Sequence, residues 1–158
     1  MANPDNPRTG ATFEEAVRAF FGKRGLSLVP SIQVPVGVGA IKKLHKFDLG
    51  SESPPVVVEC KCHVWTEGGN APSAKLSVWN EAMYYFFCAP SGYRKIFVVQ
   101  RTLRKGQSLA EHYLSRYRHL VPSDVEFWEF DPATGSGRVL RLEDGAGAVQ
   151  QGVEADEA

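Results

Sequence analysis

Two carboxylates and a lysine lie close together at the end of an apolar stretch of the chain. Asp48 closes the segment 42–49, and Glu59 and Lys61 directly follow three valines at 56–58. Charged side chains beside buried apolar residues are costly unless they are paired or bind a ligand. Two converging carboxylates supply the hard oxygen ligands that Mg²⁺ prefers. A lysine beside such a metal can orient or deprotonate an attacking water, or stabilise negative charge on a phosphate, so these residues suit phosphodiester hydrolysis.

The three valines predict a buried strand over residues 55–64, because they are β-branched, contiguous and preceded by Ser53-Pro54-Pro55. Side-chain alternation places Glu59, Lys61 and His63 on one face with Val57, and the cysteines on the other. Glu59 and Lys61 are then about 6.5 Å apart. The loop 50–55 predicts a hairpin, and antiparallel pairing would let Asp48 reach the face of Glu59.

At these residues the chain resembles the PD-(D/E)xK nuclease superfamily, which has the restriction-endonuclease-like fold. The core motif of that superfamily is an Asp, a spacer and a Glu-x-Lys on the next strand, matched here by Asp48, Glu59 and Lys61. Phe47 stands where a Pro sometimes precedes the Asp. The superfamily also has a glutamate on its first helix, for which Glu14 is the better match and Glu15 the second candidate. The resemblance covers roughly residues 10–100.

The resemblance implies a Mg²⁺-dependent DNA endonuclease, with Mn²⁺ as a substitute ion. Asp48 and Glu59 would bind the metal, Lys61 would orient or activate water, and Glu14 would assist through the metal or a second ion. A nuclease of this size has little protein outside its core to recognise bases. A homodimer that addresses two strands is therefore one expected arrangement.

Four other interpretations stay open. Glu59 and Lys61 could be an exposed cross-strand pair on a half-solvated sheet. The chain could be a catalytically inactive nuclease-fold protein that binds nucleic acid or serves as a subunit, or an interaction module with no nucleic-acid role. Glu14 and Glu15 could simply stabilise the start of a helix, where the helix dipole favours acids.

Charge is distributed unevenly along the 158 residues. The formal net charge is zero, but residues 143–158 hold five acids and no Lys or Arg, which leaves 18 basic against 13 acidic residues in 1–142. A mildly basic folded part fits a protein that contacts a phosphate backbone. We expect a flexible lead at 1–9, one domain at 10–142 and a disordered acidic tail at 143–158.

The chain has neither a run of roughly 18 apolar residues nor the charged start of a signal peptide, so we expect a soluble, cytoplasmic protein. Its three cysteines give no disulfide framework. Cys60 and Cys62 are expected in the core rather than at a zinc ion, because alternation places His63 on the opposite face.

Hydrophobic periodicity and turn residues predict an α/β fold in the order α-β-β-β-α-β-α-β, with a central mixed sheet. The expected elements in the first half of the chain are a helix capped by Thr12 and ending at Gly22 or Gly25, a bent or edge strand over 26–38, and the strands 42–49 and 55–64. They are followed by a helix from 73 or 74 to 88, a strand over 94–100 parallel to its neighbour, a helix from 107 or 108 to 119, a strand over 125–130 and a weak strand over 138–142.

Lys75, Asn80 and Glu81 are polar candidates near the site. Lys42, Lys43, His45 and Lys46 form a basic approach to Asp48, usable for phosphate contact or simply a solvated face.

Overall fold

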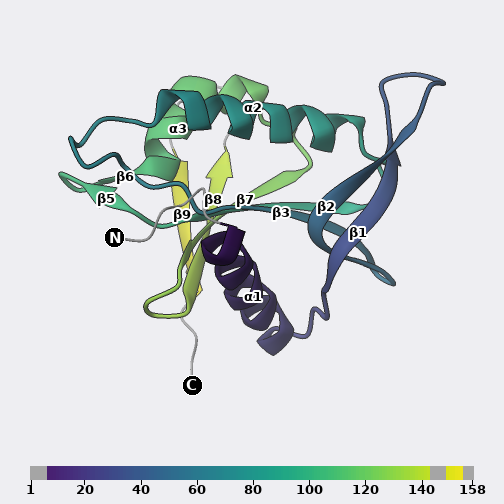
Figure 1. Cartoon of the computed structure of the whole chain (residues 1–158), viewed down its shortest axis with the longest axis horizontal. Helices are drawn as coiled ribbons and strands as arrows, with labels where there is room; N and C mark the ends of the chain where they lie inside the picture. Colours follow the sequence, from purple (N-terminus) through teal and green to yellow (C-terminus); the bar gives the residue numbers. More distant parts are fainter. Residues whose placement is uncertain (1–6, 143–148, 155–158) are drawn as a thin grey trace.

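The central strands carry apolar side chains on both faces, so helices cover the sheet on both sides. The computed structural model describes residues 7–142 and 149–154 of the chain. Helix α1 (Pro7–Lys23) lies on one face of the sheet, and α2 (Ser73–Cys88) and α3 (Leu109–Tyr117) lie on the other (Figure 1). Among the described residues, no helix is both long and apolar enough to cross a membrane.

The sheet is mixed, as the sequence predicts. Its spatial order is β1-β2-β3-β4-β7-β8-β9. The strands are β1 (Val29–Val36), β2 (Lys43–Glu52), β3 (Pro55–Lys61), β4 (Arg94–Gln100), β7 (Val125–Asp131), β8 (Ser136–Leu142) and β9 (Val149–Glu154). Strands β3, β4 and β7 are parallel, whereas the other neighbouring pairs are antiparallel. The expected α/β class, with an early hairpin and a later helical crossover, is confirmed.

The alternation predicted for β3 is also confirmed. Val57 packs in the cluster beneath α2 and α3, whereas Val56 and Val58 pack with Cys60 and Cys62 in the cluster beneath α1. The three cysteines are buried, and none of them forms a disulfide. The valine strand is therefore buried on both faces, and its polar residues emerge only where it ends.

Several element boundaries differ from the prediction. Helix α1 begins at Pro7, so Thr12 is an interior residue whose hydroxyl donates to the Arg8 carbonyl at 2.9 Å instead of capping the helix. Strand β3 ends at Lys61, not at residue 64. The loop 50–55 is shorter than expected, because β2 continues to Glu52 and pairs with Pro55. Ser108 caps α3 as predicted, accepting from the Glu111 N–H at 3.1 Å.

Two additions were not predicted. A small hairpin of β5 (Leu103–Arg104) and β6 (Gln107–Ser108) precedes α3. Strand β9 lies within the tail that was expected to be disordered, and it pairs with β8. The remaining tail residues, 143–148 and 155–158, and residues 1–6 of the expected lead lie outside the described parts of the chain.

Candidate active site

Strands β2 and β3 stop pairing just where the chemically interesting residues begin. Their regular register ends at Leu49 and Val58, although both strands continue beyond this point. Beyond this point on β3, the Cys60 N–H donates to the Asp48 carboxylate at 2.8 Å. The Asp48 side chain therefore takes the place of a backbone acceptor, which holds it beside Glu59 and Lys61.

A local irregularity in β2 explains the orientation of Asp48. Phe47 packs beneath α2, whereas Leu49, two residues later, packs beneath α1, so the usual alternation breaks at Asp48. On the neighbouring strand β1, Ser31 lies between the paired residues Pro30 and Ile32 and has a φ of 61°. A non-glycine residue with positive φ marks a local bend. The expected bend in this edge strand thus lies opposite Asp48.

Glu59 and Lys61 lie on the α2 face of β3 and form an ion pair. The Lys61 Nζ donates to Glu59 Oε1 at 3.1 Å, and both side chains are largely shielded, with 17% and 14% of their surfaces exposed. They line a pocket of about 60 Å³, together with His45, Phe47, Val78, Glu81, Ala82 and Tyr85. The pair is not an exposed surface pair, because both side chains are largely shielded and line a pocket.

Glu59 has one carboxylate oxygen with no hydrogen-bond partner among the described residues. This atom, Oε2, is buried. Buried carboxylate oxygens in native proteins are normally hydrogen-bonded, paired or bound to metal. The unpartnered atom therefore indicates a carboxylate that can accept a further ligand.

Glu14 approaches the same place from α1, and Glu15 does not. The Glu14 carboxyl and the Asp48 carboxylate share a hydrogen bond, and burial together with the Asp48 charge raises the pKa of Glu14 to about 7. Glu15 points outward and forms an ion pair with Arg18 at 3.2 Å, where 65% of its side-chain surface is exposed. Of the two predicted candidates, only Glu14 is brought to Asp48.

Burial raises the pKa of all three carboxyl groups, and the charge of Asp48 adds to the shifts of Glu14 and Glu59. Burial, followed by the charge of Asp48, raises the pKa of Glu59 to about 7, although Lys61 opposes the shift. Burial also raises the pKa of Asp48, against the Cys60 N–H, Lys61 and Lys46. Three acids crowded together with raised pKa values form an arrangement that a cation would relieve.

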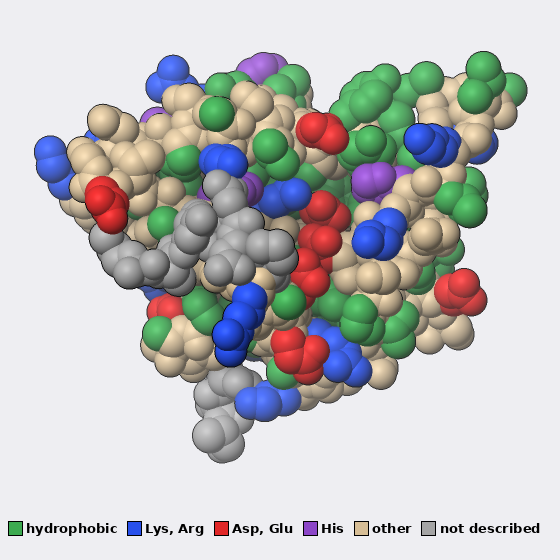
Figure 2. Space-filling view, in the orientation of Figure 1, with side chains coloured by type: hydrophobic (Ala, Val, Ile, Leu, Met, Phe, Trp, Pro, Cys, Tyr) green, Lys and Arg blue, Asp and Glu red, His purple; other side chains and the backbone are tan. Residues whose placement is uncertain are grey.

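Acidic side chains gather on one face of the molecule. Figure 2 shows them at the centre of the view, with basic side chains on both sides and the outline notched between α2 and the β1–β2 hairpin. His45 and Tyr85 of α2 line the pocket of Glu59 and Lys61, and their rings stack with centroids 3.7 Å apart. These acidic side chains are therefore accessible from solvent between α2 and the hairpin.

The residues fit a hard divalent cation in chemistry but do not form a finished coordination shell. Asp48, Glu59 and Glu14 supply carboxylate oxygens, the ligands that suit Mg²⁺. Within residues 7–142 and 149–154, no group of three or more His, Cys, Asp or Glu side chains is arranged ready to hold a metal ion. Asp48 is turned to the Cys60 N–H and Glu59 to Lys61, so the carboxylates are gathered but engaged elsewhere.

The structure separates the polar candidates on α2. Glu81 lines the pocket beside Glu59 and Lys61. Asn80 instead accepts a hydrogen bond from the Tyr113 hydroxyl at 2.7 Å, within the packing between α2 and α3. The role of His45 and Tyr85 as a stacked pair in the pocket wall was not predicted, since no sequence pattern links residues 40 positions apart.

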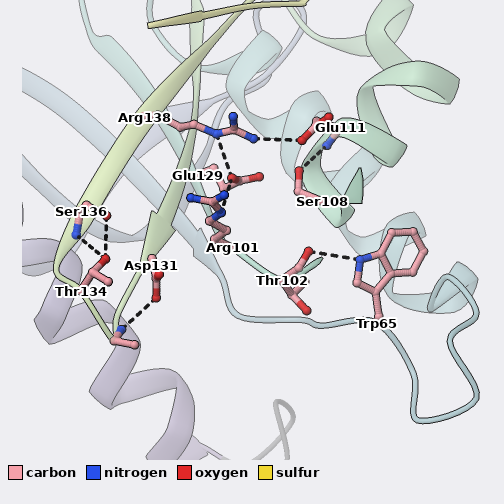
Figure 3. Close-up of polar contacts among 11 residues, drawn as sticks. Trp65, Arg101, Thr102, Ser108, Glu111, Glu129, Asp131, Thr134, Ser136 and Arg138 are labelled. Carbon is pink, nitrogen blue, oxygen red and sulfur yellow. Dashed lines mark hydrogen bonds and ion pairs between the residues drawn. The ribbon is translucent and has the colours of Figure 1, made fainter. Parts of the chain in front are cut away.

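A second polar cluster lies further along the same face of the sheet. The register places Lys61, Val99, Glu129 and Arg138 in one row across neighbouring strands. Figure 3 shows Arg101 and Arg138 around the Glu129 carboxylate, with Arg138 also contacting Glu111. The Glu129–Arg138 contact is 2.9 Å and Glu129 is buried. This cluster ties β7 and β8 to α3, and nothing in the sequence predicts it.

Comparison of the chain with protein-family models, curated proteins and solved structures finds no match. We therefore infer the function from the arrangement of Glu14, Asp48, Glu59 and Lys61.

Proposed function

We propose that this protein is a Mg²⁺-dependent DNA endonuclease with a restriction-endonuclease-like core. One observation carries the proposal: carboxylates from α1, β2 and β3 crowd together beside a lysine, where Glu59 keeps a buried oxygen without a partner. Asp48, Glu59 and Glu14 would hold the metal, which would polarise the scissile phosphate and lower the pKa of a bound water.

Lys61 supplies a positive charge at this site, to which Lys46 adds. One of the Lys61 N–H groups is engaged by Glu59, and its ammonium also lines the pocket. An ammonium group beside a phosphate stabilises the negative charge that develops as the nucleophile attacks. Glu59 positions Lys61, so the pair orients the group that meets the phosphate.

Glu14 and Asp48 can handle a proton at this site. They share a hydrogen bond, and the pKa of Glu14 is raised to about 7. A carboxyl group with a pKa near neutrality is suited to exchanging a proton close to working pH. Glu14 would therefore be protonated below pH 7 and available as a ligand above it.

The proposal is tested with purified protein on plasmid, linear and branched DNA in Mg²⁺ or Mn²⁺, with EDTA as control. Cleavage that requires the metal supports it. Binding is measured separately in Ca²⁺. Binding without cleavage in Mg²⁺ or Mn²⁺ would instead support the catalytically inactive alternative, and absence of both would favour an interaction module.

A matched pair of variants separates charge from geometry at Lys61. Lys61→Met keeps most of the side-chain length but removes the charge, and cleavage should fall by at least about 100-fold. Lys61→Arg keeps the charge and should retain part of the rate. Equal rates for wild type and Lys61→Met would contradict the assigned role.

A further inference from the structure

The hairpin of β1 and β2 extends beyond the body of the molecule. Figure 1 shows its connecting loop as the outermost part of the fold on the side of β1 and β2. Asp48 lies on β2, at the base of this projection. The hairpin and α2 also flank the pocket that contains Glu59 and Lys61. A substrate that enters the pocket must therefore pass beside the hairpin.

The hairpin tip is apolar and exposed. Ile41 exposes 91% of its surface and Val38 exposes 71%. Large apolar side chains this exposed lose favourable burial unless a partner covers them. Their position at the end of a thin ribbon suits insertion into a narrow partner better than docking on a broad surface.

The tip is held in a fixed conformation. The Gly37 N–H donates to the Cys88 carbonyl at the end of α2, at 3.1 Å. Lys42 donates to the Gly37 carbonyl at 2.8 Å. A Cβ at Gly37 would collide with the Ile41 carbonyl oxygen, so this close turn requires glycine. A preorganised tip loses less conformational entropy when it binds.

The charge of the hairpin is one-sided outside its base, where Asp48 and Glu52 lie. Residues 25–47 contain no Asp or Glu, whereas Lys42, Lys43 and Lys46 are present and exposed. A ribbon of this charge repels a second copy of itself and attracts a polyanion. Charge complementarity therefore favours nucleic acid over a protein partner for the apolar tip.

We propose that the β1–β2 hairpin binds double-stranded DNA, with Ile41 and Val38 inserted between base pairs and Lys42, Lys43 and Lys46 on the phosphates. Apolar wedges of this kind unstack a base step and bend the duplex. The proposal rests on the proposed function, since it assigns the hairpin to the substrate of the same site. Asp48 follows Ile41 by seven positions along the chain, about 23 Å of extended strand. The unstacked step should therefore lie within about seven base pairs of the cut.

The test uses the full chain in Ca²⁺ and a duplex that carries 2-aminopurine at successive positions, whose fluorescence rises when its base unstacks. Wild type should raise the fluorescence at one step within that distance. Ile41→Ala should lose the signal and bind about tenfold more weakly. Lys43→Ala should keep the signal and lower the slope of log affinity against log salt by about one unit. The control Leu120→Ala changes an exposed apolar residue on the 3₁₀ turn after α3 and should behave as wild type.

The outcomes distinguish the two proposals. If wild type cleaves DNA but gives no unstacking signal, or if Ile41→Ala matches wild type, the hairpin assignment is overturned while the nuclease stands. If wild type gives the signal without cleaving in Mg²⁺, the hairpin assignment is supported and the nuclease fails. If Ile41→Ala instead converts a dimer into a monomer in light scattering without changing DNA binding, the tip is an interface between copies and the assignment is overturned.

Discussion

The Asp48 carboxylate accepts the backbone N–H of Cys60 at 2.8 Å, immediately after the regular pairing of β2 and β3 ends. One side chain thus satisfies the backbone of the strand that carries Glu59 and Lys61. The strands separate at this point without leaving a buried donor unpaired. The opening between them is where the three carboxylates gather.

Asp48 therefore has a structural role that can be separated from its proposed chemistry. Asp48→Ala leaves the Cys60 N–H without its acceptor, and the free energy of unfolding should fall by about 1–3 kcal/mol. Asp48→Asn keeps an oxygen acceptor, so it should unfold nearly as wild type does but lose Mg²⁺-dependent cleavage. Urea denaturation and a plasmid assay on both variants test this. Equal stability of the two variants would argue against the capping role of the carboxylate.

Glu14 and Glu15 form a natural matched pair on α1. Glu14 meets Asp48, whereas Glu15 is exposed and paired with Arg18. Glu14→Gln should lower the cleavage rate by roughly 100-fold, because it removes a charge from the site. Glu15→Gln should change it by less than about twofold, since exposed ion pairs contribute little. The result that contradicts the assignment is a larger loss in Glu15→Gln than in Glu14→Gln.

The raised pKa values of Glu14 and Glu59 make stability depend on pH. Both values rise from 4.5 to about 7 on folding. Between these limits the folded state binds more protons than the unfolded state, so the free energy of unfolding should fall as pH rises from about 4.5 to about 7. Glu59→Gln should flatten this dependence. Urea denaturation at a series of pH values without divalent metal measures this pH dependence. A free energy of unfolding that rises between pH 4.5 and about 7 would contradict the prediction.

The Glu129 cluster should matter for stability. Glu129 is buried and compensates Arg138, whose side chain is only 12% exposed. Glu129→Ala removes the buried carboxylate and leaves Arg138 with Glu111 as its acidic partner, so the free energy of unfolding should fall by about 1–3 kcal/mol. Glu67→Ala, in the exposed loop before α2, is the control and should change it by no more than about 0.5 kcal/mol. Equal denaturant midpoints for the two variants would contradict a stabilising role of Glu129.

Local patterns predict much of this fold. The contiguous valines predict β3 with the correct faces, and the spacing of Leu76, Trp79 and Met83 predicts α2, in which all three are buried. The predicted start of α1 was wrong. Thr12 and the acids after it have the pattern of a helix start, but the helix begins five residues before Thr12, at Pro7. Strand β9 was missed because its Gly- and Gln-containing sequence has little local strand preference and depends on pairing with β8.

The candidate site was predictable only in part. Alternation along β3 places Glu59 beside Lys61, but it cannot reveal the bend at Ser31 or the break in alternation at Asp48, since both arise from pairing between strands. The choice between Glu14 and Glu15 needed the angle at which α1 crosses the sheet. The His45–Tyr85 wall and the Glu129 cluster join residues distant in sequence, so no local pattern contains them.

The central claim is that the gathered carboxylates catalyse metal-dependent cleavage, and Glu59→Gln tests it most directly. This change removes one charge and keeps the shape of the side chain, so folding should be retained. The measurement is the rate of plasmid cleavage in Mg²⁺ at pH 8, for wild type and variant with matched thermal unfolding. We predict metal-dependent cleavage by wild type and a loss of at least about 100-fold in the variant. Equal rates in the two proteins, or cleavage by wild type that persists in EDTA, would contradict it.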